Sequence, residues 1–161
     1  MGQPRHPRIK PLTVSSLLAG KAPEAYCVGP GMPLLEALNR LRENALDALA
    51  VVDGPRLLGV FSPRSLSRKG LQAADLTPSQ PLAQLMSACP VHATPELAAQ
   101  DCLALMRAGQ LDCIPVLDQG AVCGLLTLDE VLSALIAQYE SIFTAAELDQ
   151  RIMFLQGTYS C

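Results

Sequence analysis

The sequence predicts a mixed α/β fold of the α+β kind: two tandem copies of a strand–helix–strand–strand–helix unit, followed by a long C-terminal helix. The phrases GVFSPRSL (59–66) and GLLTLDEV (124–131) match, residues 65 positions apart agree along the chain, and each copy shows helix and strand periodicities in the same order. A small sheet covered by helices cannot bury its apolar face alone. We therefore expect the copies to pack sheet to sheet with pseudo-twofold symmetry and to leave clefts along the seam.

The spacing of 65 fixes the alignment of the copies. Gly124 matches Gly59, and Val116 matches Val51. The same spacing joins further pairs without a gap, namely Pro30 and Pro95, Leu38 and Leu103, Leu46 and Leu111, Asp47 and Asp112, and Asp53 and Asp118. We predict a flexible basic N-terminal arm at 1–13, a first repeat at 14–76, a second repeat at 77–137 and a helical extension at 138–161.

In the first copy, a short strand from Ala25 to Val28 is expected before an amphipathic helix from Pro33 to Asn44. Its stripe consists of Leu34, Leu35, Leu38 and Leu41. The apolar runs ALAVVD and LLGVF, joined by a GPR turn, predict a hairpin. A second helix follows the serine that ends this hairpin.

The second copy repeats this order and ends in a longer helix. A short strand from Val91 to Ala93 precedes a helix from Glu96 to Ala108, and CIPVLD and VCGLL form the hairpin. Apolar residues at helical spacing continue from Leu128 to Leu155, which exceeds a typical globular helix. We expect this helix to contact a second copy or another domain; the alternative is a break near 141–144.

Composition excludes several classes of protein. Half of the 161 residues are apolar, 17% are charged and the net charge is -3, which does not fit a basic nucleic-acid binder. The start is polar and broken by proline, and no apolar run reaches the length of a membrane span, so we predict a cytoplasmic protein without a membrane partner. The six cysteines stand singly, as buried thiols would, and predict no metal site.

The phrases LDALAVVDGPRLLGVFSPRSL and LDCIPVLDQGAVCGLLTLDEV, with VGPGMPLLEAL and HATPELAAQDCL, resemble a tandem cystathionine β-synthase (CBS) domain pair, the Bateman module. The resemblance covers about Val14 to Ala137. It implies a disc-like homodimer that binds an adenine nucleotide (AMP, ADP or ATP) or S-adenosylmethionine in its clefts and regulates a partner protein that the sequence does not name. It implies no required cofactor and no catalysis.

In that family, a hydroxyl at the start of the second helix contacts phosphate and an Asp three positions later contacts ribose. The hydroxyls here are Ser62 and Thr127, and the Asp positions hold Ser65 and Glu130. Exposed N–H groups at a helix start suit an anion. The other interpretation is structural: Thr127 and Glu130 match a capping box, and Ser62 before a proline matches an N-cap.

The resemblance also implies the walls of each cleft. The cleft with Thr127 would be lined by Lys21, Tyr26, Leu46, Asp47, Asp112, Cys113 and Leu125. The cleft with Ser62 would be lined by Asp47, Ala48, Val60, Val91, Leu111 and Asp112. At the start of the helix after Ser62, Arg64, and after it Arg68 and Lys69, would add positive charge for a phosphate; alternatively, they point to water.

Two functions remain open at this point. The chain contains no Walker loop, G-x-G-x-x-G, H-E-x-x-H or nucleophile elbow, so an enzyme is not predicted. One function is a ligand-sensing regulatory module that passes its state to a partner or an oligomer. The alternative is a ligand-free dimerisation or scaffold module whose clefts are vestigial.

Overall fold

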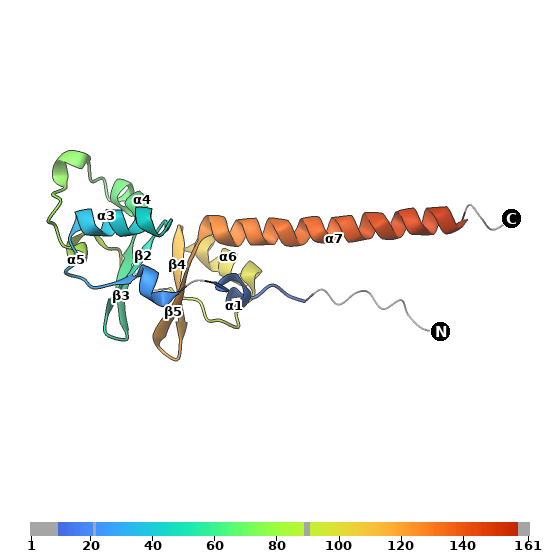
Figure 1. Ribbon diagram of the computed structural model, residues 1–161, viewed down its shortest axis with the longest axis horizontal. Helices are drawn as coiled ribbons and strands as arrows, with labels where there is room; N and C mark the ends of the chain where they lie inside the picture. The colour runs from blue at the N-terminus through green and yellow to red at the C-terminus, as the bar shows by residue number, and fades with distance from the viewer. Residues whose placement is uncertain (1–9, 21, 89–90, 158–161) are drawn as a thin grey trace.

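The structure is a computed structural model that describes residues 10–20, 22–88 and 91–157. Its fold is the predicted mixture of helices and small sheets, with the two hairpins side by side and one long helix leaving the body (Figure 1). The elements are, in order, α1 (Val14–Leu17), α2 (Pro23–Tyr26), β1 (Cys27–Val28), α3 (Leu34–Glu43), β2 (Leu49–Asp53), β3 (Arg56–Phe61), α4 (Pro63–Arg68), a 3-10 helix (Ala73–Asp75), α5 (Leu82–Leu85), α6 (Ala99–Ala108), β4 (Cys113–Asp118), β5 (Ala121–Thr127) and α7 (Leu128–Gly157).

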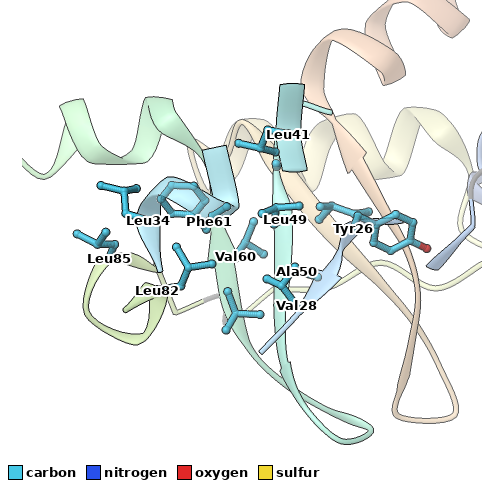
Figure 2. Close-up of a cluster of buried hydrophobic side chains, with 14 of the residues drawn as sticks. Tyr26, Val28, Leu34, Leu41, Leu49, Ala50, Val60, Phe61, Leu82 and Leu85 are labelled. Atoms are coloured by element: carbon cyan, nitrogen blue, oxygen red, sulfur yellow. The ribbon is translucent and has the colours of Figure 1, made fainter. Parts of the chain in front are cut away.

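The first sheet has the strand order β1-β2-β3. β1 is parallel to β2, with Cys27 opposite Ala50, and β2 is antiparallel to β3, with Leu49 opposite Phe61. Figure 2 shows the side chains of this sheet gathered with those of α3 and α5 into one core. Of the predicted helical stripe on α3, Leu34 and Leu41 are buried, whereas Leu35 and Leu38 are exposed.

The second sheet consists of β4 and β5, which are antiparallel with Cys113 opposite Thr127. A bridge from Ala93 to Val116 adds a parallel contact at its edge. A second core fills the space between this sheet and its helices. Its fully buried members include Cys102, Met106, Ile114, Val116, Leu126 and Val131.

The short strands predicted at the start of each repeat are shorter in the structure. Residues 23–26 form the helical turn α2, because Pro23 suits the first turn of a helix, and only Cys27–Val28 is a strand. In the second copy, the expected strand from Val91 is reduced to the single residue Ala93. Its N–H donates to Pro115 O at 2.9 Å, and its carbonyl accepts from Leu117 N–H at 2.9 Å. One paired residue therefore replaces a strand.

Each core is completed by a segment from the other half of the chain. Val14 of α1 is buried in the second core, and its N–H donates to Leu97 O at 2.8 Å. In the same way Leu82 of α5 is buried in the first core and donates to Met32 O at 3.0 Å. This exchange is symmetric, and it ties the two repeats together. The boundaries 14–76 and 77–137 stay a prediction about sequence repeats, since the cores draw on both ranges.

The glycines that open the two repeated phrases sit beneath the exchanged segments. A Cβ on Gly59 would lie 2.6 Å from the carbonyl oxygen of Ser87, whose backbone pairs with Val60. A Cβ on Gly124 would collide with the side chain of Leu18. Glycine therefore recurs at this point because the segment after α1 or α5 crosses the strand closely.

The helix α7 is continuous from Leu128 to Gly157, so the alternative of a break near 141–144 is wrong. Its first turns cover the second sheet with the buried residues Val131 and Leu135. Beyond the body the helix projects into solvent (Figure 1). Its exposed side chains there include large apolar residues.

Candidate functional site

The cleft beside Thr127 has a volume of about 350 Å³ and lies between the two repeats. Six of the residues predicted for this cleft meet there, namely Tyr26, Leu46, Asp47, Leu125, Thr127 and Glu130. Asp112 and Cys113 were predicted for it but line other clefts, and Lys21 lies outside the described residues. The small residues Gly20, Ala22, Ala25 and Ala45 leave room in the cleft, and sequence reasoning missed them.

Tyr26 forms one wall of this cleft and is itself part of the first core. Only 2% of its surface is exposed, and its hydroxyl donates to Cys123 O at 3.0 Å. Burial, reinforced by nearby Cys27, Cys123 and Glu24, raises the pKa of Tyr26 to about 12. Figure 2 shows the ring at the edge of the core cluster. The hydrogen bond thus locks the ring as a fixed wall.

Thr127 and Glu130 form the capping box at the start of α7. The Thr127 N–H donates to Glu130 Oε2 at 2.9 Å, and the Glu130 N–H donates to Thr127 Oγ1 at 3.2 Å. These bonds satisfy two backbone donors that a helix start would otherwise leave open. The structural interpretation of this pair therefore holds, and both side chains still border the cleft.

The cleft beside Ser62 is smaller, with a volume of about 170 Å³. The predicted residues Val60, Ser62, Ser65, Leu111 and Asp112 come together in it. Asp47, Ala48 and Arg64 line the neighbouring central cleft instead, and Val91 packs against the second core. Ser87 and Ala88, which arrive after α5, are lining residues that the sequence did not reveal.

An ion pair between the repeats lines the Ser62 cleft. Arg68 Nη2 lies 2.9 Å from Asp112 Oδ1. Lys69 Nζ donates to Met86 O at 2.6 Å. The predicted place of these cations at the start of the helix is wrong, because α4 ends at Arg68 and positive charge there suits the C-terminal end of the helix dipole. Ser62 caps the helix start by accepting from Ser65 N–H at 3.2 Å.

A central cleft of about 580 Å³ lies between the starts of α4 and α7. Arg42 and Arg64 bring positive charge to it, and Asp47, Asp112 and Asp129 bring negative charge. The residues Ala45, Leu46, Asp47, Ala48 and Thr127 line both this cleft and the Thr127 cleft. The two spaces are therefore adjacent and share a wall. Within the described ranges, no three His, Cys, Asp or Glu side chains gather as metal ligands would.

Two segments of the sequence match a known protein family. The model of the CBS domain matches residues 21–71 and 82–137, which together make up most of the chain. The chain belongs to the CBS-domain family. Its two matched segments form a CBS pair, a type of module that regulates other proteins.

Similar proteins support the same assignment. The CBS domain-containing protein CBSCBSPB5 of Arabidopsis thaliana is 28% identical over 118 residues, which cover 73% of this chain and 22% of that protein. The chain thus spans about a fifth of the length of this plant relative. Among solved structures, a proposed signal-transduction protein with CBS domains from Burkholderia ambifaria is 25% identical, covers 78% of this chain and 94% of its own, and has a TM-score of 0.64.

A second solved structure contains bound ligands. The CBS domain pair of protein MJ0100, solved with 5′-methylthioadenosine and S-adenosyl-L-methionine, is 17% identical, with a TM-score of 0.66 and coverage of 80% of this chain and 98% of its own. This likeness concerns the fold alone.

No helix in the described part of the chain combines the length and apolar character needed to cross a membrane.

Proposed function

We propose that this CBS pair is a regulatory module that binds one adenosine-containing ligand per chain. The adenosine lies in the Thr127 cleft, and the charged remainder of the ligand extends into the central cleft. The observation that carries this proposal is the wall common to both clefts, from Ala45 to Ala48 together with Thr127. A ligand with an apolar base and a charged tail suits two adjacent clefts of which one has charged groups along its wall.

Size and charge favour the Thr127 cleft over the Ser62 cleft. A volume of about 350 Å³ lies within the range of small-molecule sites, whereas about 170 Å³ lies below it. Arg68 and Asp112, which line the Ser62 cleft, are also already paired with each other. A phosphate there would compete with Asp112 for Arg68.

The lining residues have separate roles in this proposal. Tyr26, Leu46 and Leu125 form apolar walls for the base. Asp47 is exposed at the junction of the clefts, where its carboxylate can accept from ribose hydroxyls. Arg64 lies farther along the central cleft and can pair with phosphate. Glu130 keeps its place in the helix cap.

We also infer a disc-like homodimer that passes the bound state to a regulated partner without catalysis. Leu35 and Leu38 on α3 and Leu105 on α6 are exposed apolar side chains that a second copy would cover. Among the described residues, Cys27, Cys102, Cys113 and Cys123 form no disulfide, which fits the reducing cytoplasm. The alternative function is a scaffold with vestigial clefts.

A thermal-shift series separates these functions. AMP, ATP, adenosine and S-adenosylmethionine are each added to the full chain. A ligand at about 100 times its dissociation constant adds about 2.7 kcal/mol, or roughly 5 to 10 °C in the melting temperature. Arg64→Glu should reduce the shift caused by AMP and ATP but leave the shift caused by adenosine. Arg56→Glu, an exposed change on the hairpin of β3, is the matched control and should change neither.

The possible results are distinct. If no adenosine compound shifts the wild-type protein at millimolar concentration, the scaffold function is correct. If AMP shifts the wild-type protein and Arg64→Glu equally, the charged tail does not lie in the central cleft. Circular dichroism of each variant confirms that the fold is kept.

A further inference from the structure

The outer half of α7 carries an apolar surface that the body does not cover. Gln100 Nε2 of α6 donates to the Tyr139 hydroxyl of this helix at 3.0 Å. Beyond it, Phe143 is 67% exposed and Met153 is 72% exposed. The helix projects away from both sheets (Figure 1). Large side chains exposed along a projecting helix mark an interaction surface.

One row of side chains on this helix has the spacing of a coiled coil. One row along α7 alternates steps of four and three residues, and consists of Leu132, Ile136, Tyr139, Phe143, Ala146, Gln150 and Met153. We call this row the α7 seam. A step pattern averaging 3.5 residues is the heptad repeat of a coiled coil, with Ile136, Phe143 and Gln150 at the a positions and the others at d. A helix that packs on a globular core shows a wider stripe with a period of 3.6 instead.

We propose that the α7 seam pairs antiparallel with the α7 seam of a second copy. In an antiparallel coil each a residue faces a d residue, and one register matches the whole seam. Phe143 then faces Ala146 of the second copy, so the largest side chain meets the smallest. Tyr139 faces Gln150 of the second copy, and Ile136 faces its Met153. Because the pairing is symmetric, each of these layers occurs twice.

The length of α7 supports the same register. In it, residues 132–157 of the two helices overlap, which is about 39 Å at 1.5 Å per residue. The end of each helix at Gly157 then reaches Leu132 of the second copy, beside its body. A parallel pair would set both bodies at the same end of the coil. It would also stack Phe143 on Phe143 and Ala146 on Ala146, giving uneven layers.

The charged side chains of α7 are also compatible with the antiparallel register. The antiparallel register brings Glu140 near Glu147 of the second copy, which is unfavourable. It also sets Arg151, the single basic residue from 128 to 157, near Glu140 of the second copy. The arginine therefore offsets this repulsion, which occurs twice near the middle of the coil. This contact is separate from the disc-like contact through α3 and α6, so either can form without the other.

Sedimentation of the full chain at micromolar concentration tests the pairing. Phe143→Glu should lower the particle mass about twofold. Leu148→Glu is the matched control, since Leu148 is 54% exposed on α7 but lies off the seam, and it should leave the mass unchanged. An unchanged mass in Phe143→Glu, or an equal loss in both variants, overturns the proposal. Because Phe143 is exposed, the body should melt at the wild-type temperature in both variants.

Disulfide trapping tests the orientation. Ile136→Cys and Met153→Cys are made separately in chains that also carry Cys89→Ser and Cys161→Ser, and diamide is the oxidant. The antiparallel register predicts an interchain disulfide only when the two variants are mixed. Disulfides within each variant alone would show a parallel pair and overturn the proposed orientation. Sedimentation and disulfide trapping are both measured without ligand. This proposal can therefore fail while the proposed function holds, and the reverse.

Discussion

Tyr26 links the first core to the proposed ligand cleft. Its ring fills the core beside β1, and its hydroxyl reaches across to the carbonyl of Cys123 on β5. One side chain thus joins the two repeats and forms a wall of the space between them. Thr127 has a similar double position, since it caps α7 and borders both clefts. These residues between the two repeats therefore stabilise the fold and also line the proposed site.

The raised pKa of Tyr26 predicts a loss of stability in alkali. Because the folded-state pKa of about 12 exceeds the ordinary value of 10.0, folding favours the protonated phenol. The stabilisation is complete below pH 10 and is lost as the pH rises from 10 through 12. By pH 11 the free energy of unfolding should fall by about 1 kcal/mol. Urea unfolding at pH 9 and pH 11 measures this loss.

Two tyrosine variants control this experiment. Tyr26→Phe should remove this part of the pH dependence and cost about 1 kcal/mol at neutral pH, since the bond to the Cys123 carbonyl is lost. Tyr139→Phe changes a half-exposed tyrosine and should keep the pH dependence of the wild-type protein. An equal alkaline loss in Tyr26→Phe and the wild-type protein would show that another group is responsible.

At the scale of elements, the sequence predicted the regular parts and missed the short ones. The helices α3 and α6, both hairpins and the long α7 follow from periodicities that extend over many residues. The four-residue helices α1, α2 and α5 are too short to show a period. The end of α4 could have been found, because Gly70 has a positive φ of 73° and follows the helix as a terminating glycine does.

The site was predictable to a similar extent. The resemblance to the CBS family predicted that Leu46, Asp47 and Thr127 line one cleft, and they come together there. The exchange of α1 and α5 left no such signal, because these segments lie outside the matched spacing. Ser87 and Ala88 therefore entered the Ser62 cleft unpredicted. The pair between Arg68 and Asp112 forms because α4 ends at Arg68. The pattern of charges in the sequence alone does not predict that end.

The glycines under the exchanged segments predict an asymmetry between the repeats. Gly59→Ala should cost about 2 to 3 kcal/mol of unfolding free energy, because its Cβ meets the backbone oxygen of Ser87. Gly124→Ala should cost about 1 kcal/mol, because its Cβ meets the movable side chain of Leu18. Urea unfolding of both variants checks this order. Equal costs would show that the two crossings are equally rigid.

At the scale of the whole molecule, the exchange of α1 and α5 makes the two repeats one unit. Neither repeat can complete its core without a segment from the other half, so the clefts between the repeats keep a fixed shape. The repeats are nevertheless unequal as ligand sites. An ion pair lines one cleft, whereas the other shares a wall with the central cleft. This inequality predicts one ligand per chain.

The central claim is that the Thr127 cleft alone holds the adenosine group. Isothermal titration calorimetry of the full chain with AMP, ATP and S-adenosylmethionine tests it most directly. We predict that at least one of them binds with a stoichiometry of one per chain, and that Ala22→Trp, which fills this cleft from an exposed position, abolishes the binding heat. Two ligands per chain, or unchanged binding in Ala22→Trp, would contradict the account.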